Sequence, residues 1–187
     1  MKDIIQKADE FALSEIEKFG LPTMLNYNLS NEKGLELAKE SGADADIVSI
    51  GTRLMDIKLG EAFRQGRLKE HIEMGVNATK QFLLKFEIDE RIKEKIIDCV
   101  KGHHGGWVSK EAEVCANADC YRFLLLRNWL AFFNSLGARN TTFEEDLAWA
   151  EKKADEKWDI LSIEKCRNEL ERDYKLIKKI INKAKLS

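Results

Sequence analysis

The stretch ADIVSIGTRLMDIKLGEAF, residues 45–63, decides the fold class of this chain. Its apolar residues cover most faces of the helix that their spacing predicts, which is typical of a helix buried in the middle of a fold. The flanking sequence repeats the helical spacing. We expect helices over 2–19, from Ser30 or Asn31 to 41, from Asp44 or Asp46 through this stretch, over 68–86 and 90–101, from Ser109 or Lys110 to 133, and after Thr142 and Ser162. No segment alternates with a period of two, so the sequence predicts an all-α fold.

Length and composition narrow the class of protein. The 187 residues suit a single domain over 1–187. With 31 Lys and Arg against 33 Asp and Glu, the net charge of −2 offers no general attraction for nucleic acid, and we expect no nucleic-acid partner. We expect no membrane span and no targeting segment. The four cysteines form no CxxC pair, so we predict reduced thiols and a cytoplasmic location.

Two acids and three histidines suggest a preassembled site. Asp56 and Asp119 lie in apolar helix interiors, where a carboxylate must be neutralised, hydrogen-bonded or bound to a cation. The histidines, His71, His103 and His104, are the only ones in the chain. A metal shared by these side chains would satisfy all of them. A mixture of imidazole and carboxylate suits manganese, iron, zinc or cobalt better than calcium.

Five phrases of the sequence occur in an order that resembles a known family. They are LELAKESGAD (35–44), IGTRLMDIKLG (50–60), KEHIEMG (69–75), IIDCVKGHHGG (96–106) and EAEVCANAD (111–119). In this order they resemble the HD-domain metal-dependent phosphohydrolase superfamily, over about residues 26–122. The resemblance implies an HD-like helical bundle over about 26–133, with a C-terminal helical extension over about 142–187.

The resemblance also implies a chemistry. It indicates a phosphohydrolase or phosphodiesterase that acts on a nucleotide or another phosphorylated small molecule. The expected metal ligands are Asp56, His71 and His103. His104 and Asp119 are expected as further ligands or as groups that orient water. Asp56 is also the expected catalytic group.

Three positions depart from the family pattern. The early family histidine falls at Asn26, or at Tyr27 or Asn28 if the register differs, and the histidine of the His-Asp pair is Met55. Because a thioether is a poor ligand for hard divalent ions, Met55 does not replace an imidazole. The first aspartate of the last phrase is Asn117. The family's principal metal position therefore keeps only its aspartates, Asp56 and Asp119. We expect at most one metal, held by the ligands that remain for the family's other metal position: Asp56, His71 and His103 or His104.

Three hypotheses remain open at this point. In the first, one metal activates water for attack on a phosphoester. In the second, the metal is lost and the pocket binds a phosphorylated ligand without turnover. In the third, the domain is a structural or interaction module. In the first, Lys58 and Arg53 contact phosphate, and Lys58 assists catalysis. In the other two, the Lys58 ammonium group fills the emptied metal position and neutralises Asp56. Asp56 could also pair with Arg53, and Asp119 with Arg122. A homodimer stays open.

Overall fold

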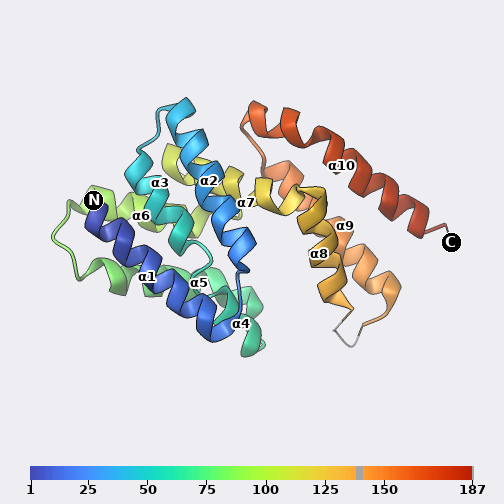
Figure 1. Ribbon diagram of the computed structural model, residues 1–187, viewed down its shortest axis with the longest axis horizontal. Coiled ribbons are helices and arrows are strands. Elements are labelled where there is room, and N and C mark those ends of the chain that lie inside the picture. The colour runs from blue at the N-terminus through green and yellow to red at the C-terminus, as the bar shows by residue number, and fades with distance from the viewer. Residues whose placement is uncertain (138–140, 187) are drawn as a thin grey trace. The chain divides into compact units, whose positions relative to one another are not determined.

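The computed structural model describes residues 1–137 and 141–186 and is helical, with no strand among them (Figure 1). The prediction of an all-α fold is confirmed. In these residues no helix combines the length and the apolar character that crossing a membrane requires.

The chain divides into two compact units, Met1–Asp119 and Cys120–Ser187. The elements of the first unit are α1 (Lys2–Phe19), α2 (Met24–Ser41), α3 (Ala45–Leu54), α4 (Leu59–Arg64), the 3-10 helix η1 (Leu68–Glu70), α5 (His71–Leu83), α6 (Glu90–Gly102) and the start of α7 (Lys110–Leu124). The second unit holds the end of α7, α8 (Leu126–Leu136), α9 (Phe143–Ile160) and α10 (Glu164–Ala184).

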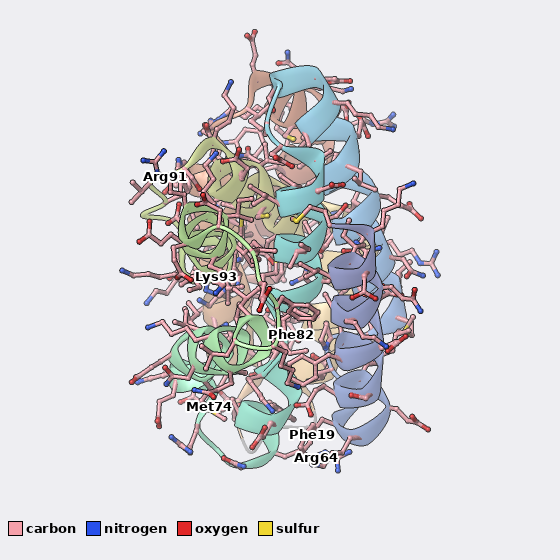
Figure 2. All side chains as sticks on the ribbon, turned by 90° about the vertical axis from the view of Figure 1, so that its left-hand side faces the viewer. Phe19, Arg64, Met74, Phe82, Arg91 and Lys93 are labelled. Atoms are coloured by element: carbon pink, nitrogen blue, oxygen red, sulfur yellow. The ribbon has the colours of Figure 1, made fainter. Side chains whose placement is uncertain are left out.

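Helix α3 is the centre of the first unit, as its apolar sequence predicts. Helices α1, α2 and α6 all pack against it, and α5 packs against α6 (Figure 1). Two glycines permit close approaches between α3 and its neighbours. A Cβ on Gly34 of α2 would lie 2.7 Å from Thr52 Cγ2, and one on Gly51 would lie 2.5 Å from Cys99 Cβ. Figure 2 shows Phe82 in the interior of this unit, where its ring stacks on Phe11.

Three expected helix boundaries were wrong. Helix α2 begins at Met24 rather than at Ser30 or Asn31, because Thr23 Oγ1 accepts a hydrogen bond from Asn26 N at 3.3 Å and no residue between them breaks the helix. The helix expected through 45–63 is interrupted by a turn over 55–58, in which the Leu59 amide donates to the Asp56 carbonyl at 2.9 Å.

The third break, at Leu125, divides the helix expected to reach 133. The backbone groups that it frees find side-chain partners within the second unit. The Leu126 amide donates to Asp173 Oδ2 at 2.9 Å, and Asn128 Nδ2 donates to the Arg122 carbonyl at 2.7 Å. The break is therefore stabilised by tertiary hydrogen bonds.

The second unit contains the C-terminal helices. Thr142 and Glu145 form the predicted capping box at the start of α9. Helix α10 packs on α8 and α9 through an apolar stripe that includes Ile177 and Ile181. Lys178 of α10 also pairs with acidic side chains of α9.

Candidate metal centre

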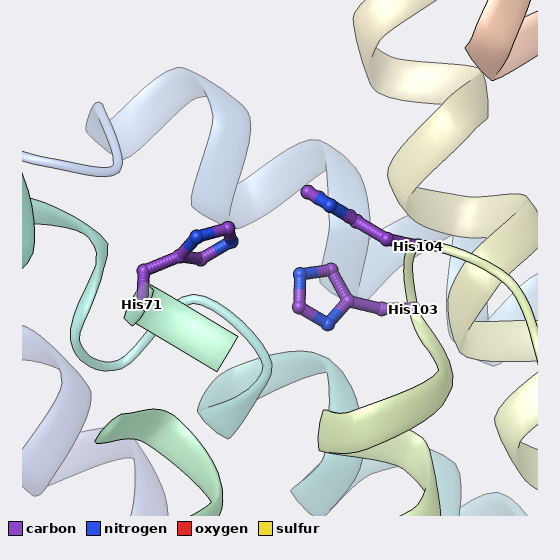
Figure 3. Close-up of side chains that lie close together, drawn as sticks. All are labelled: His71, His103 and His104. Atoms are coloured by element: carbon purple, nitrogen blue, oxygen red, sulfur yellow. The ribbon is translucent and has the colours of Figure 1, made fainter. Parts of the chain in front are cut away.

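The three histidines of the chain converge in the first unit. The nitrogens that His71, His103 and His104 offer as ligands all lie within 4.8 Å of one another. Figure 3 shows the three rings gathered around one point, with His71 on one side and the two consecutive histidines on the other. The ring centroids of His71 and His104 are 5.1 Å apart, and those of His103 and His104 are 4.3 Å apart.

Helix ends place two of these rings. His71 follows η1 as the first residue of α5, and His103 directly follows the last residue of α6. In both, Nδ1–H donates to the carbonyl three residues earlier, that of Leu68 at 2.7 Å and that of Val100 at 2.7 Å. Each bond fixes the orientation of the ring and leaves Nε2 as the nitrogen with a free lone pair.

Both predicted acids lie at the histidines. Asp56, in the turn after α3, places Oδ1 3.6 Å from His103 Nε2, and Asp119 of α7 places Oδ2 4.0 Å from His104 Nε2. Both carboxylates are buried, whereas the His104 side chain is 33% exposed. The structure thus gathers the three histidines and places each acid beside one of them, Asp56 at His103 and Asp119 at His104, and His104 forms the solvent-facing edge.

The burial of this cluster leaves two nitrogen atoms without hydrogen bonds to the described residues. Nε2 of His71 and Nε2 of His103 are buried, and neither has a hydrogen-bond partner in the described part of the chain. An unsatisfied buried polar atom costs about 1–3 kcal/mol. Burial lowers the pKa of His71, against the opposing charge of Asp56, which favours the neutral imidazole that binds metals. Unpartnered imidazole nitrogens beside a carboxylate fit a divalent transition metal.

Arg53 and Lys58, expected as phosphate contacts, are each held by a carboxylate from α1, and Lys58 is also held by one from α4. Arg53 Nε donates to Asp9 Oδ1 at 2.9 Å. Lys58 Nζ donates to Glu15 at 2.7 Å and to Glu61 at 2.8 Å. These partners already neutralise both cations, so their placement favours neither phosphate binding nor the alternative in which Lys58 replaces a metal beside Asp56.

The substituted family positions lie in ordinary helical surroundings. Asn26 is half-buried in the first turn of α2. Met55 is buried in the core directly after α3. Asn117 Nδ2 donates to the Glu113 carbonyl one turn earlier in α7 at 2.9 Å.

Sequence reasoning missed the two carbonyls that orient the imidazoles. In the sequence, these carbonyls are marked only by lying three residues before a histidine at a helix end. Many histidines at helix ends do not make this bond. Gly75 of α5 leaves ordinary space between its helix and α6. A Cβ built there would lie 3.5 Å from Val100 Cγ1, which is an ordinary contact.

Comparison of the chain with models of protein families, with curated proteins and with solved structures finds no significant match.

Proposed function

We propose that this protein is an HD-type metal-dependent phosphohydrolase that uses a single divalent ion of manganese, iron, zinc or cobalt. The observation that carries the proposal is the pair of buried Nε2 atoms of His71 and His103, which make no hydrogen bond to a described residue, with the Asp56 carboxylate 3.6 Å from that of His103. The family-like phrases support it further, because the side chains that converge come from four of those phrases. The expected substrate is a nucleotide or another phosphorylated small molecule.

In this proposal each residue has a defined task. His71 and His103 hold their Nε2 atoms toward the centre because backbone carbonyls fix their rings. Asp56 supplies the buried negative charge, and Asp119 orients the exposed His104 ring. The bound ion would lower the pKa of a water ligand and neutralise charge on a phosphoryl oxygen.

Metal binding can be tested directly. The chain has three histidines, so the Cε1–H region of a proton NMR spectrum holds three imidazole signals. Titration with Co²⁺ should shift all three in a 1:1 ratio, and metal analysis should find one ion per chain. Asp56→Asn should weaken binding at least about tenfold, since it removes the charged ligand. Asp146→Asn is the matched control, because Asp146 is an equally buried aspartate of the second unit.

Two results decide the proposal. Stoichiometric binding that Asp56→Asn weakens and Asp146→Asn does not, with metal-dependent release of p-nitrophenol from p-nitrophenyl phosphate or its diester, supports the hydrolase. Failure of all four metals to bind, or equal affinity in both variants, refutes it.

A second candidate is a module that binds a phosphorylated ligand or a protein partner without turnover. It is favoured by Met55 and Asn26, which occupy positions where the family has histidines. Its signature is stoichiometric metal or nucleotide binding with no product released from any phosphoester.

A further inference from the structure

A surface groove lies between α1 and α2, on the first unit. Both helices pack on α3 but make few contacts with each other, which leaves a space of about 350 Å³. This volume falls within the usual range for small-molecule sites. The groove is lined by Asp9, Leu13, Met24, Tyr27, Asn28, Asn31, Glu32, Leu35 and Arg53, and by none of the five residues of the metal centre.

The polar side of the groove contains a fixed network. Asp9 Oδ1 accepts hydrogen bonds from Tyr27 OH at 2.5 Å and from Arg53 Nε at 2.9 Å. Arg53 Nη1 donates to the Ser49 carbonyl at 2.9 Å. The positive charge of Arg53 is thereby compensated, whereas Asp9 Oδ2 makes no hydrogen bond to any described residue.

Two further acceptors face no protein donor. Glu32 is exposed and has no hydrogen bond or ion pair with a described residue. Asn31 is only 8% exposed, and its Oδ1 lacks a hydrogen-bond partner in the described residues. The lining contains the two carboxylates of Asp9 and Glu32 and the one guanidinium group of Arg53, which Asp9 already neutralises. It therefore has a net charge of −1 and an excess of hydrogen-bond acceptors.

The groove is also lined by apolar side chains. Leu13 of α1 is 37% exposed, and Met24 at the start of α2 is 44% exposed; Leu35 also lines the groove but lies beyond Glu32 along α2, away from Met24. A ligand that fits both parts has a donor-rich cation at one end and an alkyl chain at the other.

We propose that this groove binds a primary alkylammonium ion. Its ammonium group donates to Glu32, to Asp9 Oδ2 and, through a small rotation of the amide, to Asn31 Oδ1. Its methylene groups cover Leu13 and Met24, where removal of their apolar surface from water adds affinity. The two carboxylates disfavour a carboxylate or phosphate in the same place. The inference is independent of the proposed hydrolase.

Three probes with the same chain isolate the role of the head group: hexylammonium chloride, hexanol and sodium hexanoate. Each is titrated into the full-length protein and followed by amide shifts in ¹H–¹⁵N NMR spectra. We expect hexylammonium to shift amides of residues 9–13 and 24–35 saturably, hexanol to bind more weakly, and hexanoate to bind most weakly.

Matched variants test the acceptors. Glu32→Gln should weaken hexylammonium binding about fivefold, since it removes a charge-assisted hydrogen bond at an exposed position. Glu87→Gln, an exposed carboxylate between α5 and α6, should leave the affinity unchanged. The proposal is overturned if hexanol or hexanoate binds as tightly as hexylammonium, if the shifts spread over acidic residues elsewhere, or if both variants respond alike.

Discussion

Replacing Gly51 by alanine should destabilise the first unit, although alanine is the better helix former. The new Cβ would lie 2.5 Å from Cys99 Cβ and 2.9 Å from the sulfur atoms of Cys99 and Cys115. Rotation of a side chain cannot move a Cβ, so the helices must separate. Overpacking of this kind costs about 3 kcal/mol, against a gain of about 1 kcal/mol in helix propensity. We therefore expect a net loss of about 2 kcal/mol in the free energy of unfolding.

Gly75→Ala provides the matched control. Gly75 is also a buried glycine within a helix, but its added Cβ would meet its nearest neighbour at 3.5 Å. Only the propensity gain remains, so this variant should be about 1 kcal/mol more stable than the parent protein. The two variants should differ by about 3 kcal/mol, with opposite signs relative to the parent protein.

Native-state hydrogen exchange is the appropriate assay. The most protected amides of α3 and α6 report the opening free energy of the helices that pack around Gly51. A value for Gly51→Ala equal to or above that for Gly75→Ala would refute the packing argument.

Three further changes should have measurable effects. Asp98→Ala removes the acceptor of the Ser109 amide and hydroxyl at the start of α7, both at 2.6 Å, and should cost about 1–2 kcal/mol in urea denaturation. Lys58→Met leaves two part-buried carboxylates without their shared cation; we expect a loss of about 1–2 kcal/mol at pH 7, and an unchanged stability would contradict the ion pairs. Burial, reinforced by the hydrogen bond to Asp155, raises the pKa of Tyr174 from 10.0 to about 12. The unfolded chain then loses this proton first, so stability should fall as the pH rises from 10 to 12, less steeply in Tyr174→Phe.

Helix identity was predictable from the sequence because apolar spacing and capping residues are local signals. The two breaks were not, and a tertiary hydrogen bond stabilises the one at Leu125. Nothing at residues 55–58 resembles a helix terminator, and the break at Leu125 depends on Asp173, almost fifty residues away. Boundaries that depend on a distant partner are invisible to local patterns.

The candidate site was also predictable only in part from the sequence. Its acids and histidines could be predicted because such groups are costly in an apolar interior unless something satisfies them. The assignment of Arg53 and Lys58 to phosphate failed to anticipate their partners, because Asp9 and Glu15 come from α1. That helix lies outside the stretch that resembles the family, so the resemblance could not indicate what it contributes.

The packing around Gly51 also bears on the proposed function, because the two cysteines that Gly51 contacts each lie one helical turn before a proposed metal ligand. Cys99 of α6 lies one helical turn before His103, which directly follows that helix, and Cys115 lies one turn before Asp119 in α7. If the helices separate near Cys99 and Cys115, the side chains proposed to hold the metal therefore move as well. If the site binds metal as proposed, Gly51→Ala should weaken Co²⁺ binding as well as folding, whereas Gly75→Ala should strengthen folding alone. A Gly51→Ala variant that lost stability yet kept its full affinity for Co²⁺ would show that the ligand positions do not depend on this layer of packing.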